Sequence, residues 1–151
     1  GYLWNEVRVK GGAYGVMCKF TRYGSGSFVS YRDPNLSATY EVYKKAADYL
    51  ATYEADEREV TKTIIGTISG LDTPLTPAMD GKRSMNIYLT KTPLEVLQKE
   101  RDQILACTKE DIRKTADAVR KVADAENICV IGNEQHIKDE ASMFEVIKPL
   151  S

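Results

Sequence analysis

Apolar residues recur every three or four positions through most of this 151-residue chain, which is the spacing of one face of an α-helix. Capping residues, glycines and prolines mark where these apolar stripes start and stop. The pattern therefore predicts a series of helices. They cover residues 2–10, 37–53, 78–89 and 134–141, or start at residues 56–59, 92–95 and 108–111.

Four shorter segments have the pattern of β-strands instead. In residues 13–22, Val16, Cys18 and Phe20 alternate with more polar positions, which is typical of a strand with one buried face. A glycine- and serine-rich turn leads to a second strand at residues 28–32, so the two predict an antiparallel hairpin. Residues 127–132 are continuously apolar and predict a buried strand. A final strand is expected at residues 144–147.

The order of these elements indicates an α+β fold. Two early strands, about six helices and then one or two late strands favour helices packed on one face of a mainly antiparallel sheet. The length suits a single domain over residues 1–151. Because the sheet is small and the first helix starts abruptly at the chain start, we expect this domain to be truncated, with further strands upstream.

Composition excludes several classes of function. The net charge of −1, with acids and bases interspersed, argues against nucleic acid as a partner. No apolar run approaches the roughly 18 residues that span a bilayer, so no membrane partner is expected. Cys18, Cys107 and Cys129 are widely spaced, which predicts three reduced and mostly buried thiols of a protein that is not secreted. His136 is the only histidine and is predicted to be a solvated helix residue, so no metal site is expected within this chain.

The strongest candidate for chemistry is the pair Arg8 and Tyr14, which flanks Gly11 and Gly12. Glycine permits a left-handed turn and close backbone approach, so the two side chains are able to converge across the break. A guanidinium and a phenol would together offer hydrogen-bond donors to a peptide carbonyl or a developing oxyanion. The alternative is a structural salt bridge for Arg8 and a packed Tyr14.

Two other patterns favour structural explanations. The glycines of residues 11–15 follow a helix and lead into a strand, whereas a phosphate-binding loop runs from a strand into a helix, so no nucleotide site is expected. Tyr40 and Tyr43 have helical spacing, which is more typical of core packing than of an aromatic binding face.

Residues 7–15 (VRVKGGAYG) followed by residues 30–35 (SYRDPN) closely resemble the C-terminal domain of presequence proteases, in the pitrilysin/insulinase family of inverted zinc metallopeptidases. The resemblance spans nearly the whole chain, with residues 73–77 as a weaker match and the last thirty residues similar only in character. It implies part of a metallohydrolase domain of the kind found in LuxS and mitochondrial processing peptidase.

The resemblance also implies a zinc endopeptidase built as two halves that close around short, unstructured peptides. Its N-terminal half would carry an H-x-x-E-H zinc site with the glutamate as general base, while Arg8 and Tyr14 match residues that reach the substrate. This chain contains no such zinc ligands, so we expect zinc only in the full-length enzyme and no activity from the chain alone. The implied partners are the N-terminal half of the same polypeptide and peptide substrates. The implied compartment is the bacterial cytoplasm or an organellar matrix.

Two other functions remain open from the sequence. Relatives of this fold serve as non-catalytic scaffolds that bind peptides or assemble complexes, and an upstream zinc motif would distinguish the enzyme from the scaffold. A free-standing small binding domain predicts a monomer whose sheet is fully covered.

Overall fold

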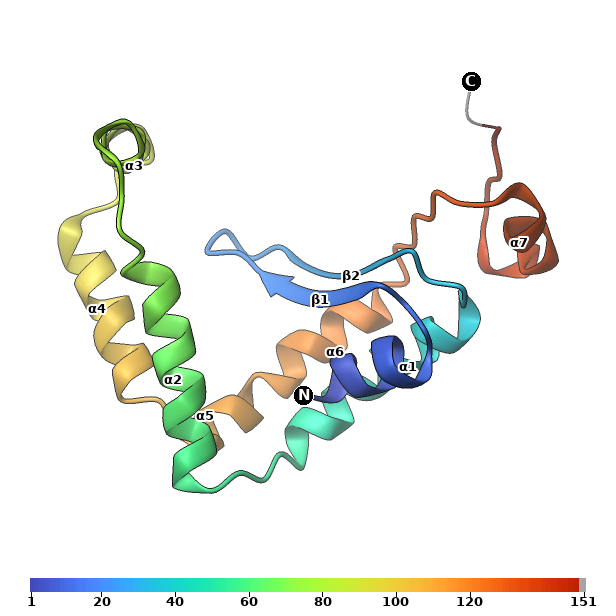
Figure 1. Ribbon diagram of the computed structural model, residues 1–151, viewed down its shortest axis with the longest axis horizontal. Coiled ribbons are helices and arrows are strands. Elements are labelled where there is room, and N and C mark those ends of the chain that lie inside the picture. Colours follow the sequence, from blue (N-terminus) through green and yellow to red (C-terminus); the bar gives the residue numbers. More distant parts are fainter. Residues whose placement is uncertain (150–151) are drawn as a thin grey trace. The chain divides into compact units, whose positions relative to one another are not determined.

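The computed structural model describes residues 1–149, which divide into two compact units. One consists of Gly1–Thr52 together with the chain from Lys114 onward, and the other is Tyr53–Arg113 (Figure 1). Each unit is described separately below. That the whole chain forms one truncated domain stays a prediction.

The first unit contains the β-hairpin and the helices that pack against it. The strands β1 (Gly15–Phe20) and β2 (Gly26–Tyr31) pair antiparallel from Gly15 opposite Tyr31 to Phe20 opposite Gly26. The predicted hairpin is therefore confirmed, with Gly24 at a φ of +84° in its turn. The helical elements of this unit are η1 (Trp4–Lys10), α1 (Ser37–Ala51), α6 (Ala116–Asp124), α7 (Glu134–Asp139) and the short η2 (Ala141–Met143).

The core of this unit lies between α1 and α6, which run side by side (Figure 1). Ala46 and Ala47 of α1 meet Val119 of α6, and all three are buried. Small side chains let the two helix backbones approach closely. The buried face that the sequence predicts for α6 is confirmed, since Ala116 and Ala123 are buried beside Val119.

Aromatic rings attach the hairpin to this helix pair. Phe28 of β2 stacks on Tyr43 of α1 with ring centres 4.7 Å apart. The Tyr40 hydroxyl donates a hydrogen bond to the Ala123 carbonyl at 3.1 Å. The tyrosines of α1 therefore pack and bridge elements, as their spacing predicts, and the hairpin is covered on one face by helices.

The second unit is helical and has no fully buried residue on its first three helices. It contains α2 (Glu57–Leu71), α3 (Pro77–Leu89), α4 (Leu94–Leu105) and most of α5 (Lys109–Lys114). The predicted start of α2 is confirmed, because Asp56 accepts the Glu59 N–H at 2.8 Å. Arg101 joins α4 to the end of α2 through two hydrogen bonds to the Asp72 carboxylate, at 2.5 and 2.8 Å. Among residues 1–149, no helix has both the length and the apolar character needed to cross a membrane.

The predictions for the late strands are wrong. Residues 127–132 run without a strand partner, and residues 144–147 follow η2 without forming a strand. A strand needs a hydrogen-bonded neighbour, and among the described residues the two-stranded sheet ends at β1 and β2.

The predicted cap of α4 is also shifted, because Pro93 occupies the N-cap position and Thr92 makes no capping bond there. The fold class itself is confirmed as a small α+β arrangement.

The alanine contact between α1 and α6 leads to a stability prediction. Ala47 has no exposed surface, so Ala47→Leu forces the two helices apart and lowers the free energy of unfolding by about 1–3 kcal/mol. Urea denaturation followed by circular dichroism measures the change. Ala51→Leu is the matched control, because Ala51 ends the same helix with its side chain exposed. Equal midpoints for the two variants would contradict this account of the core.

Candidate functional site

Two glycines end η1, and each is required for a different reason. A Cβ on Gly11 would lie 2.5 Å from the Val7 carbonyl oxygen, closer than real side chains approach. Gly12 has a φ of +80°, a left-handed conformation that other residues adopt at a cost. η1 is a π-helix, whose turns are wider than those of an α-helix. At its end, the Gly11 N–H donates a hydrogen bond to the Glu6 carbonyl at 3.0 Å, and the Ala13 N–H donates one to the Val7 carbonyl at 3.1 Å. The predicted helix stop at the double glycine is therefore confirmed.

The two sequence patterns at residues 7–15 and 30–35 contact each other directly. The Asn35 side chain donates a hydrogen bond from Nδ2 to the Gly11 carbonyl at 2.6 Å. Asp33 holds the Asn35 backbone by accepting its N–H at 3.0 Å. The Tyr14 N–H donates to the Tyr31 carbonyl at 3.1 Å, which continues the hairpin ladder to the glycines. The turn after β2 therefore fixes the path of the chain between Arg8 and Tyr14.

Arg8 and Tyr14 lie together on the surface of this unit. The Arg8 guanidinium carbon is 5.6 Å from the centre of the Tyr14 ring and 4.1 Å from the Trp4 ring. Tyr14 is 62% exposed, so it is not a packed core residue. Within residues 1–149 no carboxylate pairs with Arg8. The donors of both side chains are free to meet a ligand.

The structure adds three residues that the sequence interpretation missed. Arg32 places its guanidinium carbon 5.9 Å from the Tyr14 ring centre and 5.4 Å from that of Tyr31. Tyr31 meets Tyr14 edge-to-face with ring centres 6.0 Å apart. We name Trp4, Arg8, Tyr14, Tyr31 and Arg32 the Arg8–Tyr14 cluster. Two signals were present in the sequence: Trp4 lies four residues before Arg8, and the other two residues lie in the second pattern.

The Arg8–Tyr14 cluster is a cationic and aromatic surface. Arg32 has a φ of +48°, which is unusual for a residue with a side chain and is often found where function requires a set geometry. Cation–π contacts at exposed positions contribute only about 0.5–1 kcal/mol each, so they orient the two arginines without burying them. Such a surface can donate hydrogen bonds to a carbonyl, a carboxylate or an oxyanion. Its five residues include no carboxylate, histidine, serine or cysteine, which are the commonest bases and nucleophiles of hydrolases.

The other candidate groups have ordinary environments. His136 lies exposed on α7, which confirms its prediction as a solvated helix residue. Burial raises the pKa of the Cys18 thiol and, together with the Asp111 carboxylate, that of Cys107, so neither is an activated nucleophile. Cys129 is exposed and the other two cysteines are only partly buried, so the prediction of mostly buried thiols is wrong. Across the described part of the chain, no three histidine, cysteine or carboxylate side chains are grouped to hold a metal ion, so these residues do not fit a zinc site.

Comparison with known proteins gives consistent matches along the chain. The family model described as the PreP C-terminal domain matches residues 1–134. Protein HypA of Clostridium perfringens is 46% identical over 147 residues, which cover 97% of this chain and 15% of that protein. Presequence protease 1, chloroplastic/mitochondrial, of Arabidopsis thaliana is 35% identical over 154 residues, covering 99% of this chain and 14% of that protein. The chain thus spans about one seventh of the length of these two relatives.

The two glycines predict a measurable pattern of substitution effects. Gly12→Ala should lower the free energy of unfolding by about 1–2 kcal/mol, because alanine is strained at a positive φ. Gly11→Ala should cost at least as much, because its Cβ meets the Val7 carbonyl. Gly15→Ala is the matched control, since a Cβ there meets open space, and its effect should stay within about 0.5 kcal/mol. Urea titration compares the three variants, and a neutral Gly11→Ala would show that the turn is not as tight as described.

Proposed function

The chain belongs to the PreP C-terminal domain family, and from that premise we propose that it is the substrate-binding part of a zinc-dependent endopeptidase that degrades short, unstructured peptides. Membership confirms the resemblance drawn from residues 7–15 and 30–35. The observation that carries the proposal is the Arg8–Tyr14 cluster, in which a guanidinium and a phenol lie side by side with their donors free.

Arg8 and Tyr14 would act on the peptide as hydrogen-bond donors. A guanidinium makes charge-assisted bonds to a carbonyl oxygen, and these strengthen as negative charge develops on that oxygen during attack by water. The Tyr14 hydroxyl adds a second donor from the other side of the double glycine. Trp4 and Arg32 would hold the two side chains in place through their ring contacts. This is electrostatic assistance to peptide hydrolysis and requires no bond to the substrate.

Gly11 and Gly12 belong to the proposed substrate-binding site as residues that shape it. The Gly11 carbonyl already accepts the Asn35 side chain, so it is engaged within the protein. The two glycines bring Arg8 and Tyr14 to the same surface, because a Cβ at Gly11 would clash with the Val7 carbonyl and a larger residue at Gly12 would be strained at its positive φ. Their contribution to binding would therefore come through the positions of their neighbours.

The water-activating chemistry belongs outside this chain in the proposed enzyme. Since residues 1–149 provide no metal-ligand cluster, zinc and the general base would be supplied by the N-terminal half of the same polypeptide. The isolated chain is accordingly expected to be inactive. The Arabidopsis relative is named as chloroplastic/mitochondrial, which supports an organellar compartment for the parent polypeptide, while the cytoplasm of a bacterium is the alternative compartment.

Substitution in the full-length polypeptide tests the proposal. Arg8→Ala and Tyr14→Phe should each lower kcat/KM for peptide hydrolysis by about 100-fold, the effect of losing one donor to a developing oxyanion. Matched controls are Arg58→Ala on α2 and Tyr23→Phe in the hairpin turn, neither of which belongs to the Arg8–Tyr14 cluster. Both controls should stay within about twofold. If Arg8→Ala and Tyr14→Phe also stay within that range, under about 0.5 kcal/mol, the proposed roles are wrong.

The alternative function is a non-catalytic scaffold that binds peptides through the same cluster. It is supported by the lack of any base or nucleophile in the Arg8–Tyr14 cluster. The two functions differ in turnover: a scaffold binds a fluorescent peptide and leaves it intact, whereas the enzyme cleaves it. An intact H-x-x-E-H sequence elsewhere in the polypeptide would favour the enzyme.

A further inference from the structure

Arg32 is the second arginine beside Tyr14, and the main chain sets its position. The Tyr14 N–H donates a hydrogen bond to the Arg32 carbonyl at 3.3 Å, in addition to its bond to the Tyr31 carbonyl. This contact continues the register of the hairpin, in which Gly15 lies opposite Tyr31. Arg32 is therefore attached to Tyr14 by the backbone, and the contact of its guanidinium with the Tyr14 ring follows from that attachment.

The backbone conformation of Arg32 differs from that of other residues with a positive φ. Among residues 1–149, the non-glycine residues with a positive φ are Arg32, Lys91 and Glu126. Lys91 follows the end of α3 and Glu126 follows the end of α6, and a left-handed residue is common just after a helix. Arg32 instead follows a strand, with a φ of +48°. Glycine or asparagine would adopt this conformation at lower cost, so the side chain is what favours arginine here.

The two arginines beside Tyr14 are not neutralised by the protein. Neither guanidinium pairs with a carboxylate in the part of the chain that the structure describes. Glu6, the acid nearest to Arg8 in the sequence, instead pairs with Lys10 at 2.7 Å. Two positive charges therefore lie 5.6 and 5.9 Å from one ring centre. Like charges held close together repel, and a bound anion relieves that repulsion.

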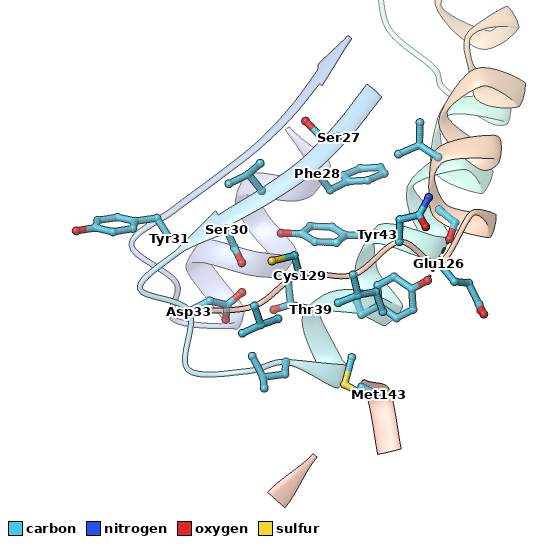
Figure 2. A pocket seen from close by; sticks show the side chains of 18 of the residues that line it. Ser27, Phe28, Ser30, Tyr31, Asp33, Thr39, Tyr43, Glu126, Cys129 and Met143 are labelled. Carbon is cyan, nitrogen blue, oxygen red and sulfur yellow. Dashed lines mark hydrogen bonds between the residues drawn. The ribbon is translucent and has the colours of Figure 1, made fainter. Parts of the chain in front are cut away.

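The acid that follows Arg32 in the sequence does not neutralise it either. Asp33 accepts the Asn35 N–H at 3.0 Å, and its second carboxylate oxygen is buried. Burial raises the pKa of Tyr43 and the charge of Asp33 adds to this effect, so the Asp33 carboxylate lies toward Tyr43. Figure 2 shows the Tyr31 ring pointing away from both of these side chains. The exposed guanidinium of Arg32 contacts that ring and the ring of Tyr14.

We propose that Arg32 binds a carboxylate of the peptide, beside the carbonyl that Arg8 would hold. A guanidinium matches a carboxylate with two parallel hydrogen bonds, one to each oxygen. Because the two guanidinium carbons lie 5.6 and 5.9 Å from the Tyr14 ring centre, they are at most about 12 Å apart, the length of three to four extended residues. The carboxylate belongs to an acidic side chain or to a free C-terminus, within about four residues of the bond that is cut. This inference rests on the proposed function, in which the Arg8–Tyr14 cluster binds peptides.

Other ligands fit these residues less well. A basic side chain would add positive charge to a surface that already carries two unpaired guanidinium groups. A nucleic acid needs a wider basic surface, whereas the whole chain has a net charge of −1. An apolar side chain would contact the exposed rings of Tyr14 and Tyr31 but would leave both arginines without a partner. A carboxylate supplies both the negative charge and the hydrogen-bond acceptors.

Peptide binding to the full-length polypeptide tests the inference. The probes are short fluorescein-labelled peptides of equal length, in which one glutamate is moved from position to position. Each is compared with its glutamine counterpart, and each is made with a free and with an amidated C-terminus. Fluorescence anisotropy is measured with a zinc chelator present, so that no peptide is cut. We expect an acidic form to bind about fivefold more tightly than its amide counterpart, the upper range for an ion pair at an exposed position.

Substitution of Arg32 should remove this preference. In Arg32→Gln the acidic and amide peptides should bind equally, while Arg32→Lys keeps the charge and should retain part of the difference. Glutamine is as compatible as arginine with a positive φ, so the free energy of unfolding should change little. Arg58→Gln on α2 is the matched control and should keep the whole preference. The arm that loses affinity, glutamine substitution or C-terminal amidation, identifies the source of the carboxylate.

Two outcomes would overturn the inference. If neither glutamine substitution nor amidation weakens binding to the unsubstituted protein, no carboxylate is recognised. If Arg32→Gln weakens all peptides equally and keeps the preference, Arg32 only holds the two tyrosine rings in place. Because binding is measured without cleavage, the result is separate from the proposed function. A protein that never cuts these peptides but prefers the acidic ones through Arg32 would retain the carboxylate site and reject only the peptidase.

Discussion

The hydrogen bond from the Asn35 side chain to the Gly11 carbonyl is the contact on which the site depends. It joins the end of η1 to the turn after β2, two places separated by the whole hairpin. Without it, the double glycine would be a hinge with many accessible conformations, because glycine has the freest backbone. With it, Arg8 and Tyr14 have defined positions on opposite sides of one turn. The glycines make the turn sterically accessible, and Asn35 selects the conformation that is used.

Among residues 1–149, the hairpin that carries this site is supported by helices that cover one of its faces. Phe28 stacks on Tyr43, and the alanine contact of α1 with α6 provides a rigid base beneath it. In the part of the chain that the structure describes, β2 pairs with β1 alone. A two-stranded hairpin is marginally stable alone and usually needs further strands or a packed helix. The helices α1 and α6 meet this requirement by packing against the hairpin.

The chemistry of the site is limited to what arginine and tyrosine can do. Both donate hydrogen bonds, and among the described residues no three histidine, cysteine or carboxylate side chains are grouped to hold a metal ion. In the proposed function, groups of this kind would stabilise charge where it develops, and another part of the polypeptide would supply the attacking water. This division of labour agrees with a chain that covers about one seventh of the relatives it matches.

Local sequence determined most of the secondary structure. The hairpin, the helix stop at Gly11 and Gly12, the Asp56 cap and the buried face of α6 followed from periodicity and capping, which depend on neighbours a few residues away. The spacing of Arg8 and Tyr14 allowed the two side chains to converge, but the Asn35–Gly11 hydrogen bond, which joins residues far apart in the sequence, selects the turn that brings them together. Tertiary structure alone decided that Arg32 and Tyr31 join them, because a contact between residues 14 and 32 depends on the register of the hairpin. It also decided against a strand at residues 127–132: an apolar run supplies the tendency to form a strand, but a strand exists only where another peptide edge accepts its hydrogen bonds.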